Sequence, residues 1–283
     1  MTRGDVEAVL APGRGAALLS LTTGGRDVLR PTPPDAEPDP RGPLETGCFP
    51  LVPYANRIAH GRFPFAGQDH RVPLNFGDHP HSLHGVGWTA PWMVEQADGE
   101  SALLSHTHGG GAGWPWRYRA EQRLTLTAGG IVLDLSLTNL SDTAMPGGIG
   151  FHPYFALEAG MALRFAARDV WLSTPDLLPD RIAPAATLGD WGAEGGAAVA
   201  GDTLVDNCYA GWDGTARVTS PGGRVVTMTA RGAPFLHVYR PPGEAFFCLE
   251  PVTHMPDALN RDGGMDVLAP GATMAITMEI GVA

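Results

Sequence analysis

Hydrophobic and polar residues alternate along several stretches of the chain. In residues 131–138 leucine occupies every second position between polar side chains, and residues 274–280 alternate in the same way. A period of two is typical of a β-strand with one buried face. Residues 235–239 and 246–249 are mostly apolar runs of strand length, which favours strands covered on both faces. The pattern therefore predicts an antiparallel β protein.

Glycine and proline separate these stretches. The chain of 283 residues contains 38 glycines and 26 prolines, and pairs such as Gly24-Gly25 and Asp213-Gly214 fall between the predicted strands. This composition predicts many turns and few long helices. The length fits one large β domain or two domains of average size.

The charge balance limits the possible partners. The formal net charge is -11, and the arginines are scattered among acidic residues. The sequence therefore shows no basic stripe that could bind the phosphate backbone of a nucleic acid. We therefore expect no nucleic-acid partner and favour a neutral or cationic small ligand. The chain has no run of 18 apolar residues and no signal-peptide pattern at its start. We accordingly expect a cytoplasmic protein without a membrane partner, and no pattern indicates an oligomeric state.

The reactive residue types narrow the chemistry. The chain has no lysine, which excludes Schiff-base chemistry and a lysine nucleophile. Cys48, Cys208 and Cys248 are widely spaced, without the pairs that disulfide frameworks or thiolate zinc sites need. We expect all three to be buried as small hydrophobic residues.

A histidine-rich segment offers one candidate site. His79, His81 and His84 fall within six residues, a spacing that could bind zinc or another divalent ion, as in a metal-dependent isomerase. Pro80 and the lack of a carboxylate at ligand spacing argue against a metal. The alternatives are loop histidines bound to the backbone, or recognition of a polar ligand by one of them.

Two further segments could carry acid–base chemistry. His152 follows glycines, precedes Pro153 and has aromatic neighbours, so its imidazole would be held rigidly beside a stacking surface, or would be an ordinary core histidine. Glu250 follows an apolar strand, and we expect Pro251 to end that strand there. Glutamate is seldom buried unless it is paired, so this carboxylate lies either at a rim or in a site.

Other segments supply hydrogen-bonding groups suited to sugar hydroxyls. Asn56 and Arg57 combine an amide with a guanidinium, and Asp206 places a carboxylate in an apolar setting.

Taken together and in order, these segments resemble the aldose 1-epimerase, or galactose mutarotase, family over almost the whole chain. The matching stretches are Asn56-Arg-Ile with Gly61-Arg-Phe, Leu83-His-Gly, His152-Pro-Tyr-Phe, Val205-Asp-Asn, and Phe247-Cys-Leu-Glu-Pro followed by Met255-Pro-Asp-Ala-Leu-Asn. The resemblance implies an all-β fold, a large antiparallel β-sandwich of the galactose mutarotase type, as a single domain over residues 1–283.

The resemblance also implies roles for individual residues. It makes Glu250 the catalytic base and His152 the catalytic acid of an enzyme that interconverts the α and β anomers of a free sugar. The implied sugar-binding residues are Asn56, Arg57, His84, Asp206 and, where many relatives have glutamine, His237. No cofactor or metal is expected, and the partner is a small-molecule sugar.

One departure bears on the substrate. Relatives that act on hexose 6-phosphates carry an arginine just after their His-Gly motif, whereas this chain reads His84-Gly-Val-Gly-Trp. An unphosphorylated aldose is therefore expected. Trp88, Tyr154 or Phe155 could offer the sugar an aromatic face, although core packing is their simpler role.

The residue types fit this chemistry at their reference pKa values of about 4.3 for Glu and about 6.5 for His, because a carboxylate can accept a proton while an imidazolium donates one. A non-catalytic sugar-binding or regulatory protein is the competing interpretation. Binding alone would need only the hydroxyl contacts, so the presence of both an acid and a base favours the enzyme.

Overall fold

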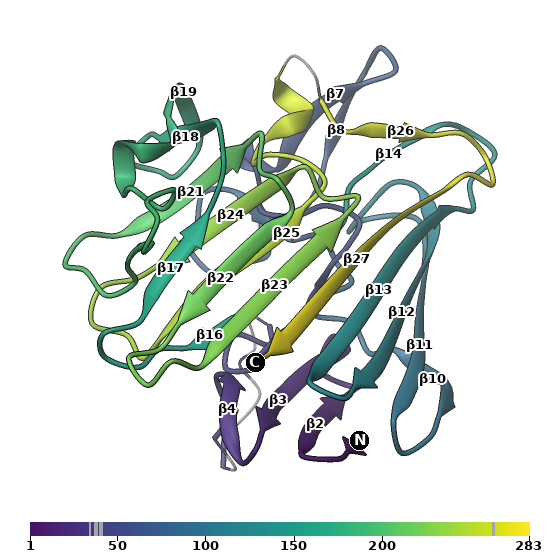
Figure 1. Cartoon of the computed structure of the whole chain (residues 1–283). Helices are drawn as coiled ribbons and strands as arrows, with labels where there is room; N and C mark the ends of the chain where they lie inside the picture. The colour runs from purple at the N-terminus through teal and green to yellow at the C-terminus, as the bar shows by residue number, and fades with distance from the viewer. Residues whose placement is uncertain (34, 37–38, 40–41, 262–263) are drawn as a thin grey trace.

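The structure is a computed structural model that describes residues 1–33, 35–36, 39, 42–261 and 264–283. Two large sheets pack face to face as a β-sandwich, as the all-β prediction required (Figure 1). The pairings of the strands named below are antiparallel, and an isolated parallel bridge joins Val52 and Gly85.

The first sheet contains twelve strands. Its main path is, in spatial order, β1 (Thr2–Arg3), β2 (Val6–Ala11), β3 (Ala17–Thr23), β4 (Arg26–Leu29), β16 (Tyr154–Ala156), β25 (Phe246–Val252), β24 (Phe235–Arg240), β21 (Val205–Ala210), β18 (Asp169–Ser173) and β19 (Pro179–Pro184). Two further strands, β15 (Gly150–Phe151) and β5 (Pro50–Leu51), pair with each other, and β15 also pairs with β25.

The second sheet contains nine strands. Their spatial order is β10 (Met93–Ala97), β11 (Ser101–Gly109), β12 (Arg117–Thr127), β13 (Gly130–Asn139), β27 (Thr273–Val282), β23 (Val225–Arg231), β22 (Thr215–Thr219), β17 (Ala162–Phe165) and β20 (Ala197–Ala198).

Smaller elements lie between and around the sheets. The three short strand pairs are β14 (Met145–Gly147) with β26 (Asp266–Leu268), β6 (Arg57–Ile58) with β9 (Ser82–Leu83), and β7 (Arg62–Phe65) with β8 (Gln68–Arg71). In the described ranges the helices are three single 3₁₀ turns, η1 (Ala59–Gly61), η2 (Ala185–Leu188) and η3 (Ala258–Asn260). The expectation of few long helices is confirmed, and none of the described helices has the length and apolar character of a membrane span.

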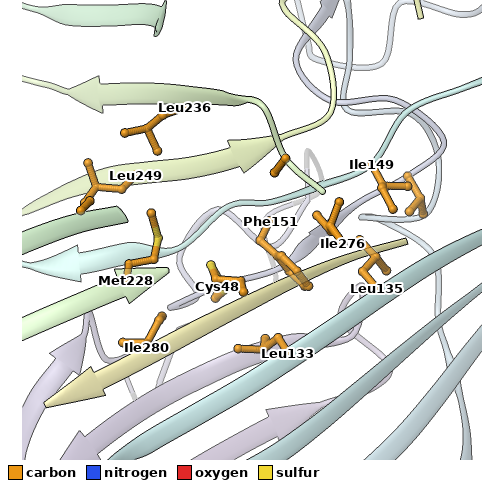
Figure 2. Close-up of a cluster of buried hydrophobic side chains, with 14 of the residues drawn as sticks. Cys48, Leu133, Leu135, Ile149, Phe151, Met228, Leu236, Leu249, Ile276 and Ile280 are labelled. Atoms are coloured by element: carbon orange, nitrogen blue, oxygen red, sulfur yellow. The ribbon is translucent and has the colours of Figure 1, made fainter. Parts of the chain in front are cut away.

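The predicted alternation sets the core. Leu133 and Leu135 of β13 pair with Met278 and Ile276 of β27, and all four side chains are buried between the sheets. Leu249 of β25 reaches the same core from the opposite sheet (Figure 2). Buried side chains from both sheets therefore form one apolar layer.

Strand β25 is buried on both faces, as its apolar run predicted. Phe247 and Leu249 point into the core between the sheets, so Cys248 and Glu250 lie on the opposite face. The expectation that Pro251 ends the strand is wrong, because β25 continues to Val252. On one side of β25 the partner strand changes from β16 to β15 near Pro251. The ladder of hydrogen bonds therefore tolerates proline, which has no N–H, at this position.

The three cysteines agree with their predicted role. All are free and buried, and burial raises the pKa of each thiol above its ordinary value. They contribute packing volume to the cores in place of reactive thiolates.

Candidate active site

A cavity of about 510 Å³ opens on the face of the twelve-stranded sheet that points away from the nine-stranded sheet. Strands β21, β24 and β25 form its floor, with Asp206, His237 and Glu250 on adjacent strands, and loops supply the walls. The cavity brings together every site residue expected from the sequence: Asn56, Arg57, His84, His152, Asp206, His237 and Glu250.

His152 and Glu250 face each other across this floor. The Nε2 atom of His152 lies 3.4 Å from Oε1 of Glu250. His152 follows β15 and precedes β16, and its ring stacks against both Phe49 and Tyr154, with centroid separations of 4.8 and 4.6 Å. These two ring contacts orient the imidazole, as the aromatic neighbours in the sequence suggested.

Burial shifts the protonation of this pair away from the reference pKa values used above. Glu250 is only 2 % exposed, and burial, followed by the negative charge of Asp206, raises its pKa well above the ordinary range. Its Oε2 atom has no hydrogen-bond partner within the described part of the chain, which disfavours the charged form further.

Burial, followed by the neighbouring His237, lowers the pKa of His152 to about 3. Both shifts favour the uncharged groups, so burial favours the neutral acid with the neutral imidazole over the ion pair.

Asp206 is the centre of a second, ionised group. Its Oδ2 atom accepts a hydrogen bond from Arg57 at 3.0 Å, and its Oδ1 atom lies 2.6 Å from Nε2 of His237. Burial alone would raise the pKa of Asp206, but the hydrogen bond from His237 and the charge of Arg57 outweigh it and hold this pKa well below the usual value. A carboxylate fixed in this way is a strong acceptor for sugar hydroxyls.

Asn56 extends the group. Its Oδ1 atom accepts a hydrogen bond from NH1 of Arg57 at 2.9 Å, and its Nδ2 atom lies 3.4 Å from Nε2 of His237. The guanidinium is therefore held by two oxygens, one from each of two elements that are far apart in the sequence.

His84 is bound to the same loop through the backbone. The N–H of Asn56 donates to Nδ1 of His84 at 3.0 Å, and the N–H of His84 donates to the carbonyl of Asn56 at 2.9 Å. Burial, followed by repulsion from His152, lowers the pKa of His84 well below its ordinary value. The neutral ring therefore carries its proton on Nε2 and can donate it to a ligand.

The other two histidines of the cluster make contacts different from those of His84, although His79 lines the same cavity. His79 Nδ1 accepts the backbone N–H of His81, and His81 Nδ1 accepts the backbone N–H of His60, both at 3.2 Å. His81 Nε2 lies 3.3 Å from the carboxylate of Asp176. Because each ring is bound to a different partner, the three imidazoles do not form the metal site considered above.

A different trio offers ligand atoms to a cation. In the described ranges, His152, Cys248 and Glu250 bring one such atom each to within 4.8 Å of one another. Burial, with Glu250 adding to it, raises the pKa of Cys248 well above its ordinary value, so the thiolate needed for a strong metal bond is disfavoured.

The cavity also contains residues that the sequence reasoning did not select. The guanidinium of Arg30 lies over the rings of Tyr154 and Phe246, at 4.1 and 4.4 Å from their centroids, and it donates to the carbonyls of Leu44 and Thr46. No local motif marks Arg30, because its partners come from distant strands.

The three candidate aromatic platforms have different environments. Tyr154 lines the cavity, whereas Trp88 is fully buried against Phe49 and Phe155 stacks on Phe247 in the core.

An acid–base pair at the floor of a polar cavity on a large β-sandwich is the arrangement that the sequence resemblance implied. The sequence model described as Aldose 1-epimerase matches residues 1–281, so this chain belongs to the aldose 1-epimerase family. The uncharacterised protein YphB of Escherichia coli strain K12 is 32% identical over 277 residues, covering 89% of this chain and 90% of YphB.

Solved structures agree on the fold. The crystal structure of the Escherichia coli K12 protein b2544 superposes with a TM-score of 0.89 at 28% identity, covering 100% of this chain and 97% of that one. A galactose mutarotase-like protein from Clostridium acetobutylicum has a TM-score of 0.85 at 19% identity, covering 99% and 93% of the two chains. The galactose mutarotase type of β-sandwich is therefore confirmed.

Proposed function

We propose that this protein is an aldose 1-epimerase that interconverts the α and β anomers of an unphosphorylated aldose. The observation that carries the proposal is the pairing of His152 Nε2 with Glu250 Oε1 at 3.4 Å on the floor of the cavity. Family membership supports the same reaction class.

The reaction requires two proton transfers. Glu250 accepts the proton of the anomeric hydroxyl while His152 donates a proton to the ring oxygen, and the bond between C1 and the ring oxygen breaks to give the open-chain aldehyde. Rotation about the C1–C2 bond exposes the other face of the aldehyde. The reverse transfers then close the ring as the other anomer, so no atom is gained or lost.

The directions of the two pKa shifts agree with these proton transfers. Ring opening starts from the carboxylate and the imidazolium, and it leaves the neutral acid and the neutral imidazole. Burial favours this second, neutral form of the two side chains. The site therefore stabilises the protonation state that accompanies the open-chain sugar, and the two side chains return their protons when the ring closes. Because the reverse transfers restore the carboxylate and the imidazolium, each turnover ends in the protonation state from which it began. The free protein reaches that state when Glu250 passes its proton to His152 across the 3.4 Å contact.

The other polar residues would hold the sugar during rotation. Asp206 and the amide of Asn56 offer acceptors, Arg57 and the Nε2–H of His84 offer donors, and Tyr154 offers a ring face. His237 acts on the sugar through Asp206, to which its Nε2 is already bound.

The charges at the cavity favour an uncharged substrate. Glu45 and Glu244 line the mouth, while the guanidinium groups of Arg57 and Arg30 are already bound to protein oxygens and aromatic rings. A phosphate group would meet two carboxylates in place of an available cation.

Polarimetry on freshly dissolved α-glucose, α-galactose and other aldoses tests the proposal. We expect at least one aldose to equilibrate faster with the protein than in buffer, and a phosphorylated aldose to respond less. If calorimetry detects sugar binding while no aldose equilibrates faster, the protein is a sugar-binding protein and the enzymatic proposal fails.

A further inference from the structure

The segment that follows Glu250 contacts both halves of the candidate site without lining the cavity. We call residues 253–257 the clamp segment. His254 and Asp257 of this segment are buried, and neither side chain lines the cavity described above.

On one side the clamp segment holds the loop that carries Asn56 and Arg57. The N–H of Ala55 donates to Nε2 of His254 at 3.1 Å, immediately before Asn56. The N–H of Asp257 donates to the carbonyl of Arg57 at 2.7 Å, which fixes the loop directly after Asn56. Asn56 is thus held between two backbone hydrogen bonds in a left-handed conformation with φ of 57°, which a residue other than glycine adopts only when its surroundings impose it.

On the other side the clamp segment holds the stretch that leads to His152. Thr253 Oγ1 accepts the N–H of Ile149 at 2.9 Å, and the N–H of Thr253 donates to the carbonyl of Ile149 at 3.0 Å. A Cβ atom on Gly148 would lie 2.1 Å from the ring of His254, so only glycine permits this packing. The acid, the base and the sugar-binding loop are therefore connected through five consecutive residues.

The imidazole of His254 is fully used by these contacts. Its Nε2 accepts the N–H of Ala55, so the neutral ring carries its proton on Nδ1, which lies 2.8 Å from the carbonyl of Met255 and donates to it. The residue is 4 % exposed and is not among the residues that line the cavity. Any effect of His254 on the reaction must therefore pass through the neighbours it contacts, and on the sugar-binding loop that neighbour is the backbone at Ala55.

We propose that His254 is a positioning residue for sugar binding: by accepting the N–H of Ala55, it fixes the backbone from which Asn56 and Arg57 reach Asp206. This inference rests on the proposed epimerase function. It assigns His254 to hydroxyl binding, because Arg57 and Asn56 are hydrogen-bonded within the group around Asp206, whereas Glu250 faces His152.

Three substitutions distinguish the contribution of Nε2 of His254 from that of Nδ1. His254→Gln keeps an acceptor near the position of Nε2, whereas His254→Asn keeps a donor near Nδ1 but is too short to reach Ala55. His254→Phe fills the space and removes both polar atoms. His106→Phe is the matched control, because His106 packs between Trp92 and Tyr118, away from the cavity.

Polarimetry should show KM raised about tenfold in His254→Phe and His254→Asn, with kcat within about twofold of the wild type. Loss of one buried hydrogen bond that orients a binding group has that order of effect, and loss of binding shared by ground state and transition state raises KM alone. His254→Gln and His106→Phe should keep the KM of the wild type. Hydrogen–deuterium exchange in a peptide covering residues 55–59 should accelerate in the Asn and Phe variants only.

Several outcomes overturn the inference. Equal KM values for His254→Asn and His254→Gln would do so, as would unchanged exchange at residues 55–59 in His254→Asn. If His254→Phe does not fold, the Asn and Gln pair still gives the comparison. If the wild type accelerates no aldose, the epimerase proposal fails separately, and calorimetric sugar affinity together with the exchange rates decides the role of His254.

Discussion

Nε2 of His237 lies 2.6 Å from Oδ1 of Asp206, the shorter of the two contacts that bind this carboxylate. The two residues occupy adjacent strands, β24 and β21, with their side chains on the cavity face. The sequence suggested His237 as a direct sugar contact in the place of a glutamine. Its geometry makes it a donor that orients Asp206.

Replacing His237 should therefore affect binding more than turnover. We expect His237→Leu to raise KM about tenfold, because Asp206 would lose a charge-assisted hydrogen bond worth on the order of 1.5 kcal/mol. His237→Gln can still donate to Oδ1 and should stay within about threefold of the wild-type KM. Steady-state polarimetry measures both values, and a kcat loss larger than the KM change in His237→Leu would contradict this role.

Glu250→Gln and His152→Asn should remove turnover. Each substitution deletes one of the two proton transfers, so we expect kcat to fall by about a hundredfold or more, with KM little changed. Polarimetry under saturating sugar gives the rates. Glu121→Gln on the other sheet is the control for loss of an acidic group, and a Glu250→Gln variant with wild-type turnover would disprove the assigned base.

The Glu250→Gln variant should fold normally at neutral pH. Because burial raises the pKa of Glu250 well above its ordinary value, it favours the neutral carboxyl, and an amide of the same shape replaces that form without burying a new charge. Chemical denaturation should show a free energy of unfolding within about 1 kcal/mol of the wild type. A much larger loss of stability would mean that the carboxylate is ionised and paired in the native state.

The pH dependence of turnover distinguishes the buried pair from two independent groups. With reference pKa values, kcat would decline as pH rises through about 6.5, because the imidazolium would be lost. In the buried pair the pKa of His152 is lowered to about 3 and that of Glu250 is raised, so neither shift predicts a titration at about pH 6.5. We expect kcat to stay level between about pH 5 and 7. Initial rates of polarimetric change, corrected for the buffer reaction at each pH, test this.

The sequence predicted the fold and the members of the site far better than their electrostatics. Alternation in β13 and the apolar run of β25 determine which faces are buried, and these are local patterns. The order of the family motifs indicated Glu250 and His152. Neither pattern contains the depth of burial, which moves the pKa values of both side chains away from the reference values.

Long-range contacts were the other part that could not be predicted. His254 lies directly before the motif that begins at Met255, yet its partner Ala55 is 199 positions away in the chain. The sequence likewise shows Asp206 as a carboxylate among apolar residues and within the Val205-Asp-Asn motif, without its partner. Its bond to His237 depends on the register between β21 and β24.

Protein stability should fall as the solution becomes acidic, partly because of His254. Burial lowers its pKa in the folded state to about 4, against an ordinary value of 6.5, so the unfolded chain binds more protons between these limits. The contribution of the neutral imidazole is thus complete above about pH 6.5 and is lost as pH falls toward 4. Each such histidine steepens the pH dependence of the unfolding free energy by up to about 1.4 kcal/mol per pH unit.

His254→Gln isolates this effect, because glutamine keeps the acceptor for Ala55 and does not titrate. Urea denaturation between about pH 4.5 and 6.5 should show a shallower rise of unfolding free energy with pH in the variant than in the wild type, while His106→Phe serves as the comparison for loss of a less buried imidazole. Identical slopes in wild type and His254→Gln would mean that His254 titrates normally in the folded protein. The folded protein would then accommodate the imidazolium below about pH 6.5, and the contact with Ala55 would not keep the ring neutral in that range.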